Sequence, residues 1–312
     1  MSLFLEELEL TAIQRIKKFA KIAEAYKFDI AVGFSGGKDS QVVYDLCKRA
    51  DVPFTAYYNV AFENPITKRF IKEYYPDVVW RKDHKFGFIE NIAKNHSGLL
   101  PTVKIAYCCE DYKHNPKYVD KCSIIGVRRQ ESNARYNRTT ISFKNKTTKK
   151  NIGGYVTDYF VENCQSIGAA SVIQLLPIVD WSDTEVWEYI HKHKLPINPE
   201  YNQNKRVGCI VCPKRNFTHN YKSLLKYPKL IDAFIWAKSF APNCDWIITT
   251  DNKDYKDDKV YYICRWLNRS FMPFTQRQEK EYEAFKRVYE QYKSNRNHGN
   301  IHDNPELINN NQ

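Results

Sequence analysis

The chain has no run of about 20 apolar residues, the length that a helix needs to cross a membrane. Its N-terminus also lacks the pattern of a secretory leader, because Glu6, Glu7 and Glu9 interrupt it. Nine cysteines are an odd number, which without a leader argues against a disulfide framework. We therefore expect no membrane segment, a cytoplasmic location, and reduced thiols that act as core side chains, metal ligands or nucleophiles.

The charge is unbalanced towards basic residues. Lysine and arginine number 48 against 36 acidic residues, which gives a net charge of +12 over 312 residues. This balance favours a polyanionic partner such as a nucleotide, nucleic acid or an acidic protein, and a solvated basic surface is the alternative.

The hydrophobic pattern predicts an α/β fold. Five short apolar runs indicate strands, and helical patterns lie between them; the runs are residues 28–34, 54–58, 78–80, 123–127 and 171–176. Strands that alternate with helices predict a doubly wound, five-stranded parallel sheet. The polar residues 141–160 are expected to form a hairpin or a flexible excursion.

The domain organisation is expected to have four parts. Residues 1–27 carry an apolar stripe at helical spacing and predict a helix that packs on the core or binds a partner. Residues 28–213 would form the nucleotide-binding domain, and residues 214–293 a basic, aromatic helical extension. Residues 294–312 are rich in asparagine and are expected to be disordered.

A glycine loop, Ser35-Gly36-Gly37-Lys38-Asp39-Ser40, joins the first predicted strand to a helix. Backbone N–H groups at a helix N-terminus bind phosphate, and glycines let the backbone approach it closely. Lys38 adds a positive charge, and the two serines add hydroxyl groups. The loop is not a Walker A sequence, because position 32 is valine, and it is not a Gly-x-Gly-x-x-Gly fingerprint.

Three arginines follow the fourth predicted strand: Arg128, Arg129 and Arg135. Sheets of this class bind ligands at the carboxyl ends of their strands, so these side chains are candidates to clamp a phosphate or sulfate group. A surface ion-pair cluster with Glu131 is the alternative.

Four cysteines show metal-ligand spacing. Cys108 and Cys109 are adjacent, and Cys209 and Cys212 form a Cys-x-x-Cys pair. Four thiolates can hold a tetrahedral zinc ion or an iron–sulfur cluster. Adjacent cysteines suit a zinc knuckle less well than spaced pairs do, which favours an iron–sulfur cluster. A zinc site and a group of thiols that binds no metal are the alternatives.

Several motifs resemble those of one family. The glycine loop after an apolar strand resembles the pyrophosphate loop of the ATP pyrophosphatase superfamily. The cysteine pattern is similar to the 4Fe–4S ligand set of adenylylsulfate reductases, and to the sulfur-mobilising enzyme of DNA phosphorothioation. Residues 126–135, 176–183 and 206–213 also resemble segments of the phosphoadenosine phosphosulfate (PAPS) reductase family. The resemblance covers roughly residues 28–215.

The resemblance implies an ATP-pyrophosphatase-type enzyme whose loop holds the β,γ-pyrophosphate while a substrate oxygen attacks the α-phosphorus. It assigns catalysis to Lys38, Asp39 and Arg128, and Asp39 would also be a ligand of Mg²⁺. Those residues would bind ATP, PAPS or adenylylsulfate together with Ser35, Gly36, Gly37, Ser40, Arg129 and Arg135. The cysteines Cys108, Cys109, Cys209 and Cys212 would hold a 4Fe–4S cluster, or zinc as the alternative.

One departure from the family shifts the expected function. Sulfonucleotide reductases carry a C-terminal Glu-Cys-Gly-x-His, whereas the last cysteine here is Cys264 in an unrelated context. The leading hypothesis is therefore adenylation of a substrate for sulfur transfer, with nucleic acid as the favoured acceptor and a sulfur-donor protein as a partner. The alternatives are a PAPS or adenylylsulfate reductase that uses a thiol in trans, and a non-catalytic nucleotide-binding subunit of an oligomer or larger complex.

The region after Pro213 mixes lysines and arginines with aromatic residues, from Lys214 to Lys229. Nucleic-acid surfaces use this combination for phosphate contact and stacking, and ordinary basic helices with aromatic cores use it too.

Overall fold

The computed structural model describes residues 3–82, 84–114, 120–145, 151–154, 171–241, 258–268 and 275–297. The chain divides into two units. The first comprises Met1–Val60, Ile66–Lys82 and His114–Gly208, and the second comprises Ala61–Pro65, Asp83–Lys113 and Cys209–Gln312. The predicted nucleotide-binding domain of residues 28–213 is thus shared between the units, because residues 83–113 group with the C-terminal residues.

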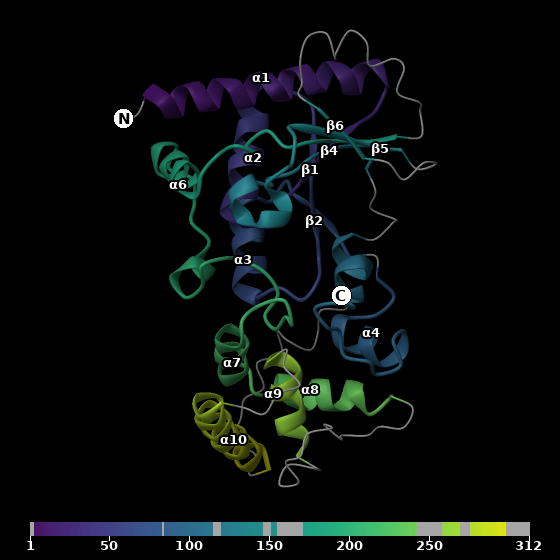
Figure 1. Ribbon diagram of the computed structural model, residues 1–312, viewed down its shortest axis with the longest axis vertical. Coiled ribbons are helices and arrows are strands. Elements are labelled where there is room, and N and C mark those ends of the chain that lie inside the picture. Colours follow the sequence, from purple (N-terminus) through teal and green to yellow (C-terminus); the bar gives the residue numbers. More distant parts are fainter. Residues whose placement is uncertain are drawn as a thin grey trace. The chain divides into compact units, whose positions relative to one another are not determined.

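The first unit is built on a seven-stranded sheet in the order β3-β2-β1-β4-β7-β5-β6 (Figure 1). The first five strands in that order are parallel, while β5 pairs antiparallel with both β7 and β6. Their bounds are β1 Ile30–Gly33, β2 Thr55–Asn59, β3 Val79–Arg81, β4 Cys122–Ile124, β5 Ile141–Asn145, β6 Asn151–Gly154 and β7 Ser171–Leu175. The predicted α/β class and the five predicted parallel strands are confirmed, but the predicted total of five strands was too low, because β5 and β6 extend the sheet with antiparallel pairing. Their antiparallel pairing agrees with a hairpin, one of the two expectations for residues 141–160.

The chain crosses from one side of β1 to the other between β3 and β4. Val32 of β1 pairs with Ala56 of β2 on one side and with Ile124 of β4 on the other. This crossover is the topological switch point at which doubly wound sheets bind their ligands.

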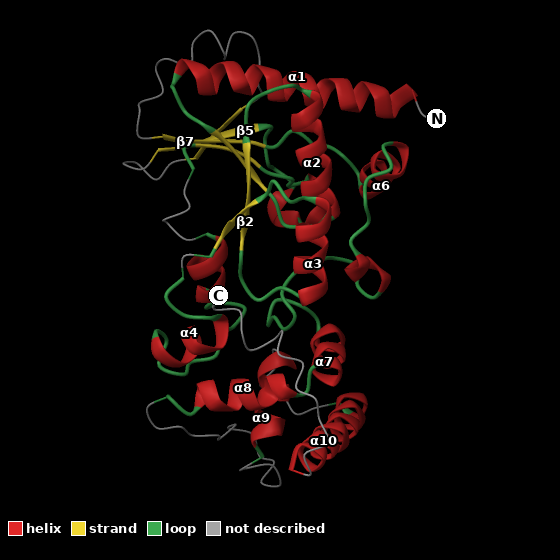
Figure 2. Cartoon of the chain, turned by 180° about the vertical axis from the view of Figure 1, so that it is seen from behind, coloured by secondary structure: helices red, strands yellow, loops and turns green. Residues whose placement is uncertain are grey.

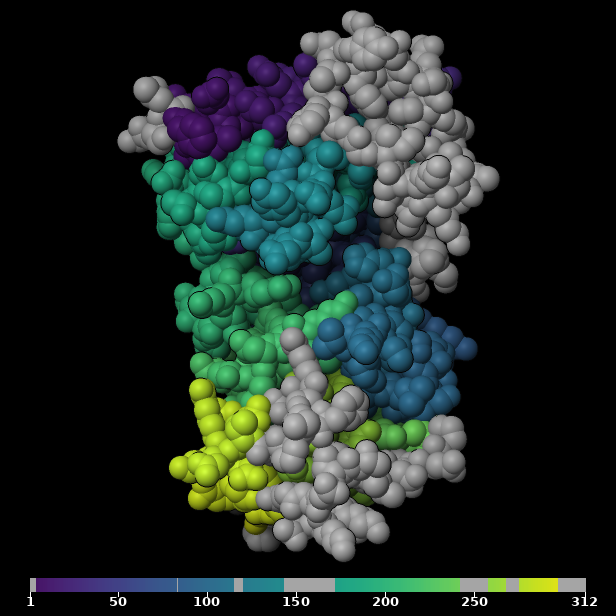
Figure 3. All heavy atoms as spheres, in the orientation of Figure 1, coloured from purple at the N-terminus to yellow at the C-terminus, as the bar shows by residue number. Residues whose placement is uncertain are grey.

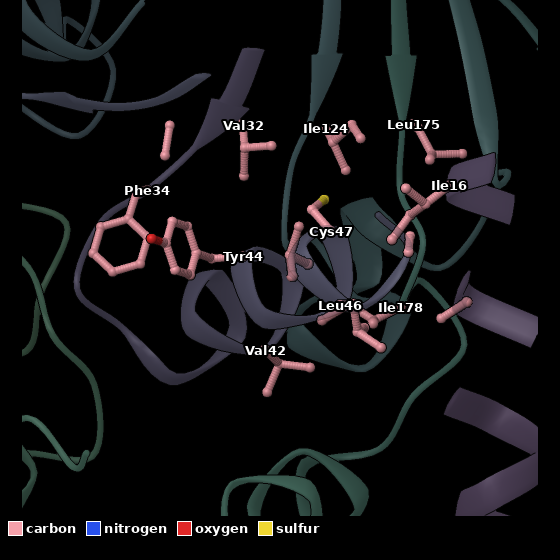
Figure 4. Close-up of a cluster of buried hydrophobic side chains, with 14 of the residues drawn as sticks. Ile16, Val32, Phe34, Val42, Tyr44, Leu46, Cys47, Ile124, Leu175 and Ile178 are labelled. Carbon is pink, nitrogen blue, oxygen red and sulfur yellow. The ribbon is translucent and has the colours of Figure 1, made fainter. Parts of the chain in front are cut away.

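Three helices of the first unit pack against one another beside the sheet: α1 Leu3–Ala25, α2 Lys38–Arg49 and α6 Asp183–Lys192 (Figure 2). Side chains from three neighbouring strands, Val32, Ile124 and Leu175, join Ile16 of α1 and Leu46 of α2 in one buried cluster (Figure 4). The apolar stripe of α1 therefore packs on the core, as one of its two expected roles required. Its other side contributes to the visible surface, in purple in Figure 3.

Local signals in the sequence set the helix boundaries. Ser182 Oγ accepts a hydrogen bond from the Glu185 amide at 3.2 Å, and Glu185 Oε2 accepts one from the Ser182 amide at 2.5 Å. These reciprocal hydrogen bonds form a capping box at the start of α6. Helix α3, Pro65–Tyr74, begins on a proline, whose fixed φ suits the first helical position.

The second unit is helical. Its helices are α4 Phe88–Lys94, α7 Phe217–Lys226, α8 Lys229–Lys238, α9 Lys259–Asn268 and α10 Gln276–Asn297. They share a buried cluster that includes Ile92, Phe234 and Phe285, and this packing explains why residues 83–113 belong here. Helix α10 runs to Asn297, so the first four residues of the predicted disordered tail are helical, while residues 298–312 lie outside the described residues. No helix in the described part of the chain is long and apolar enough to span a membrane.

Candidate nucleotide site and cysteine group

The glycine loop lies between the end of β1 at Gly33 and the start of α2 at Lys38. Gly36 has φ +70°, and a Cβ there would lie 3.0 Å from Ile71 Cγ1, so both conformation and space require glycine. Gly37 is the N-cap of α2 and supplies no side-chain oxygen to the first turn. The amide groups of this turn therefore face the position where helix N-termini bind anions.

The two serines fix the loop. The Ser35 amide donates to Ser40 Oγ at 3.1 Å, and Ser40 Oγ donates to the Gly37 carbonyl at 2.8 Å. The two hydroxyl oxygens lie 3.1 Å apart. Ser40 is buried, so its hydroxyl holds the turn together in this structure.

A buried polar network supports the loop from beneath. The Gly36 carbonyl accepts hydrogen bonds from Asn198 Nδ2 at 2.9 Å and from Gln41 Nε2 at 3.3 Å. Asn198 Nδ2 also lies 3.2 Å from Thr67 Oγ1, which donates to Glu200 Oε2 at 2.7 Å. These groups are buried and hydrogen-bonded to one another, so they hold Gly36 in its left-handed conformation.

Four charged side chains meet beside the loop. Lys38 Nζ lies 2.9 Å from Asp39 Oδ2 and 3.0 Å from Asp183 Oδ1. Arg128 Nε lies 2.5 Å from Asp39 Oδ1, and its NH2 group lies 2.9 Å from Asp183 Oδ1. Each cation is thus held by both carboxylates, and the arrangement brings together all three residues predicted to be catalytic.

Burial and charge act in opposite directions on these groups. Burial alone would raise the pKa of Asp183, but Lys38 and Arg128 hold it below its ordinary value. Burial would lower the pKa of Arg128, yet the two carboxylates raise it. Arg128 is 3% exposed, so it is a fixed, desolvated cation at this position.

The position of β4 at the switch point explains why Arg128 lies beside the first turn of α2. A Cβ on Gly126 would lie 2.7 Å from the Asp39 carbonyl oxygen and 3.1 Å from the Ser40 amide nitrogen. The chain after β4 thus passes directly against the first turn of α2, and only glycine permits this approach. Arg128 follows two residues later, and its NH1 group donates to the Trp181 carbonyl at 3.4 Å.

The other two predicted arginines do not join this charge cluster through any described contact. Arg129 Nε donates to the Arg138 carbonyl at 2.9 Å, and Arg135 forms an ion pair with Glu131. For Arg135 the contact is therefore the surface ion pair that was the alternative to a phosphate clamp.

Two residues of this site were not predicted as ligand-site residues. Asp183 was identified only within residues 176–183, which resemble a segment of the family, and its contact with Lys38 has no local signal. Tyr201 lies in the 3-10 helix Pro199–Asn202, and its hydroxyl accepts the Lys38 amide at 2.9 Å. A single tyrosine at a sequence separation of 163 residues carries no motif that could have revealed this contact.

The four predicted metal-ligand cysteines all belong to the second unit. A hydrogen bond with Cys109 and then burial raise the pKa of Cys108, and Cys209 and Cys212 raise it further. Burial raises the pKa of Cys209 to about 11, although Lys113 opposes the shift. The two cysteine pairs, 100 residues apart in sequence, thus lie within electrostatic range of each other.

Basic residues accompany the cysteine group. Lys113 Nζ lies 3.4 Å from the buried Glu63, and the charge of Cys209 raises the pKa of Lys113. Lys214 Nζ lies 3.9 Å from Cys109 Sγ. Within the described residues, however, no three His, Cys, Asp or Glu side chains converge closely enough to hold a metal ion.

The chain matches a known family. The family model of the phosphoadenosine phosphosulfate reductase domain matches residues 29–215. A solved structure, the phosphoadenylyl-sulfate (PAPS) reductase from Candida auris in a phosphate complex, is 16% identical and covers 67% of this chain and 96% of that chain, with a TM-score of 0.43.

Curated relatives show similar levels of identity. An uncharacterised protein of Methanocaldococcus jannaschii is 26% identical over 243 residues, which are 74% of this chain and 53% of the relative. Sulfate adenylyltransferase subunit 2 of Parabacteroides distasonis is 24% identical and covers 65% of this chain and 68% of the relative. Adenosine 5′-phosphosulfate reductase of Lysinibacillus sphaericus is 26% identical, and the match covers 62% of this chain and 78% of the relative. The chain spans about half the length of the first of these relatives.

Proposed function

Because the chain belongs to the phosphoadenosine phosphosulfate reductase domain family, we propose that its glycine loop binds the phosphates of ATP and that the protein activates a substrate by adenylation for sulfur transfer. The observation that carries this proposal is the meeting of Lys38 and Arg128 at the N-terminus of α2, whose N-cap is Gly37, at the switch point of the sheet. Two relatives, named sulfate adenylyltransferase subunit 2 and adenosine 5′-phosphosulfate reductase, support nucleotide and sulfur chemistry.

The proposed first step transfers an adenylyl group. A substrate oxygen bonds to the α-phosphorus of ATP, the bond from that phosphorus to the bridging oxygen breaks, and pyrophosphate leaves with the electron pair. The α2 amides, Lys38 and Arg128 would stabilise the charge on the departing pyrophosphate. Asp39 lies between the two cations and would turn towards Mg²⁺ when that ion arrives with the nucleotide. A sulfur nucleophile then bonds to the substrate atom that carries this oxygen, the bond from that atom to the oxygen breaks, and AMP leaves with the oxygen and the electron pair.

The cysteine group is proposed to hold a 4Fe–4S cluster, with zinc as the alternative. The donor set fits a cluster in its chemistry, because it supplies four thiols from one unit. Lys113 and Lys214 lie beside these thiols and would offset the negative charge of thiolate ligands. Cys108, Cys109, Cys209 and Cys212 would be the ligands.

Nucleic acid is the proposed acceptor, and this rests on a basic surface that follows the Cys-x-x-Cys pair. Lys214, Lys222 and Lys226 are exposed, the last two on α7, while Arg215 is half-buried and contacts His219. Exposed lysines on one helix can contact successive phosphates of a nucleic-acid backbone.

A second candidate is a PAPS or adenylylsulfate reductase that uses a thiol in trans, because one relative carries the name of such a reductase. Cys264 cannot be the mobile nucleophile of this reaction. It lies in α9 and is 1% exposed, and burial raises its pKa well above the ordinary value. The reductase reaction would therefore need an added thiol such as thioredoxin.

The first test is the exchange of labelled pyrophosphate into ATP in the presence of candidate nucleic acids. We expect exchange in the wild type and its loss in Lys38→Ala, while the matched control Lys48→Ala, at an exposed position of the same helix, should retain it. Reduction of adenylylsulfate with thioredoxin, without exchange, would favour the second candidate. Nucleotide binding with neither activity would instead indicate a binding subunit of a larger complex.

The second test concerns the cysteine group. Anaerobically purified protein should contain iron and sulfide, and a Cys209→Ala/Cys212→Ala variant should lose both. Cys264→Ala, which removes a thiol of the same unit, should retain them. Zinc without sulfide would indicate a zinc site in place of the cluster. An unchanged metal content in the double variant would refute the assignment of Cys209 and Cys212 as ligands.

A further inference from the structure

The Tyr201 hydroxyl reaches the glycine loop at a position where a ligand oxygen is expected. Its hydroxyl oxygen lies 2.9 Å from the Lys38 amide nitrogen, the first backbone donor of α2. The same hydroxyl would lie 3.5 Å from a Cβ placed on Gly37. The hydroxyl therefore stands directly over the two residues that open the anion site.

One amide hydrogen makes one strong hydrogen bond, so a phosphate oxygen can bind the Lys38 amide only after the phenol oxygen has left it. Hydrogen bonds to a charged phosphate oxygen are roughly twice as strong as those between neutral groups, so phosphate is able to displace the phenol. Burial raises the pKa of Tyr201, which keeps the hydroxyl neutral.

The rest of the segment is fixed. Asn198 is fully buried and donates to the Gly36 carbonyl at 2.9 Å, and its Oδ1 atom accepts the Glu200 amide at 2.9 Å. The Tyr201 ring packs edge-on against Trp187, with 5.1 Å between the ring centroids. Residues 198–200 thus anchor the segment on the loop, while Tyr201 reaches over it.

We propose that Tyr201 is a positioning residue of the phosphate site, whose hydroxyl holds the Lys38 amide in place of a phosphate oxygen and is displaced when a pyrophosphate group binds. This inference rests on the proposed phosphate-binding role of the loop. It adds a residue outside the loop motif and predicts that part of the binding energy of the ligand is used to displace the phenol.

The test is calorimetric titration of inorganic pyrophosphate into the wild type, Tyr201→Phe and the control Tyr74→Phe, whose ring is about half exposed on α3. Loss of one neutral hydrogen bond in the free state should make Tyr201→Phe bind about two- to tenfold more tightly. A merely structural tyrosine would give unchanged or weaker binding, and either result would overturn the inference while leaving the phosphate role of the loop intact. Absence of binding in all three proteins would refute both.

A measurement on the wild type does not depend on the folding of a variant. With ¹⁵N and ring-labelled tyrosine, pyrophosphate should shift the Lys38 amide signal and the Tyr201 ring signal at the same ligand concentration. A Lys38 shift without any change at Tyr201 would show that the hydroxyl is not displaced and would overturn the inference.

Discussion

Replacing Gly126 with alanine is expected to damage the nucleotide site from the side of β4. The added Cβ would lie 2.7 Å from the Asp39 carbonyl oxygen, 2.8 Å from its carbon and 3.1 Å from the Ser40 nitrogen. All three are backbone atoms of the first turn of α2, so no side chain can rotate away. Overpacking of this kind costs about 1–3 kcal/mol, and we expect Gly126→Ala to lower the free energy of unfolding by this amount.

The same overlap should weaken ligand binding beyond its effect on stability. The turn must move away from Gly126 by a few tenths of an ångström or more, which displaces the amides that would contact phosphate. Urea unfolding and pyrophosphate titration measure the two effects. The control is Gly33→Ala, whose Cβ would lie 3.0 Å from the side-chain atom Ile125 Cγ2 but 3.8 Å from the Ile124 carbonyl oxygen of the backbone. The reasoning would be refuted if the Gly126→Ala variant had the same free energy of unfolding as Gly33→Ala and the same pyrophosphate affinity as the wild type.

Three further changes test the site and its support. Arg128→Met removes the cation that contacts Asp39 and Asp183. Titration should then show pyrophosphate binding at least tenfold weaker, because a charge-assisted hydrogen bond contributes about 1.5–3 kcal/mol. Unchanged affinity would exclude Arg128 from the site. Asn198→Ala should destabilise the fold by about 2 kcal/mol in urea, since the Gly36 carbonyl loses a buried donor, whereas Asn202→Ala, exposed on the same 3-10 helix, should not. Glu9→Gln should remove a pH-dependent part of the stability, as follows from the pKa of Glu9. Burial alone would raise that pKa, but Lys192, Arg49 and His193 lower it, so its stabilisation is complete above about pH 4.5 and is lost as the pH falls through the lower folded value. The stability difference between wild type and Glu9→Gln should therefore shrink in acid, and a difference that is constant from pH 7 to pH 3 would contradict the assignment.

Local patterns were sufficient to predict the parallel strands and the loop. The strands read as apolar runs because β1 and its neighbours are buried, and the capping box at Ser182 and Glu185 depends on residues three positions apart. The division into units was not predictable in this way. Residues 83–113 join the second unit because side chains such as Ile92 pack with Phe234, and no local pattern records a partner more than 100 residues away.

The candidate site shows the same limit at the level of single residues. The loop motif identified Lys38 and Asp39, and the segment after β4 identified Arg128, but the groups that hold them came from elsewhere. Asp183 and Tyr201 contact Lys38 across separations of 145 and 163 positions. Spacing also grouped Arg135 with Arg128, although Arg135 is paired with Glu131 four residues before it.

These contacts change how the ligand affinity of the site should be understood. The ammonium group of Lys38 contacts the carboxylates of Asp39 and Asp183, and its backbone amide donates to the Tyr201 phenol oxygen. A phosphate therefore gains only the difference between its own contacts and those that it replaces. A magnesium-bound nucleotide is favoured by this exchange, because the metal can take up a carboxylate that the phosphate displaces. Free pyrophosphate must displace the same carboxylate without compensation, so adding Mg²⁺ should strengthen binding in the wild type, and Asp39→Asn should reduce that gain.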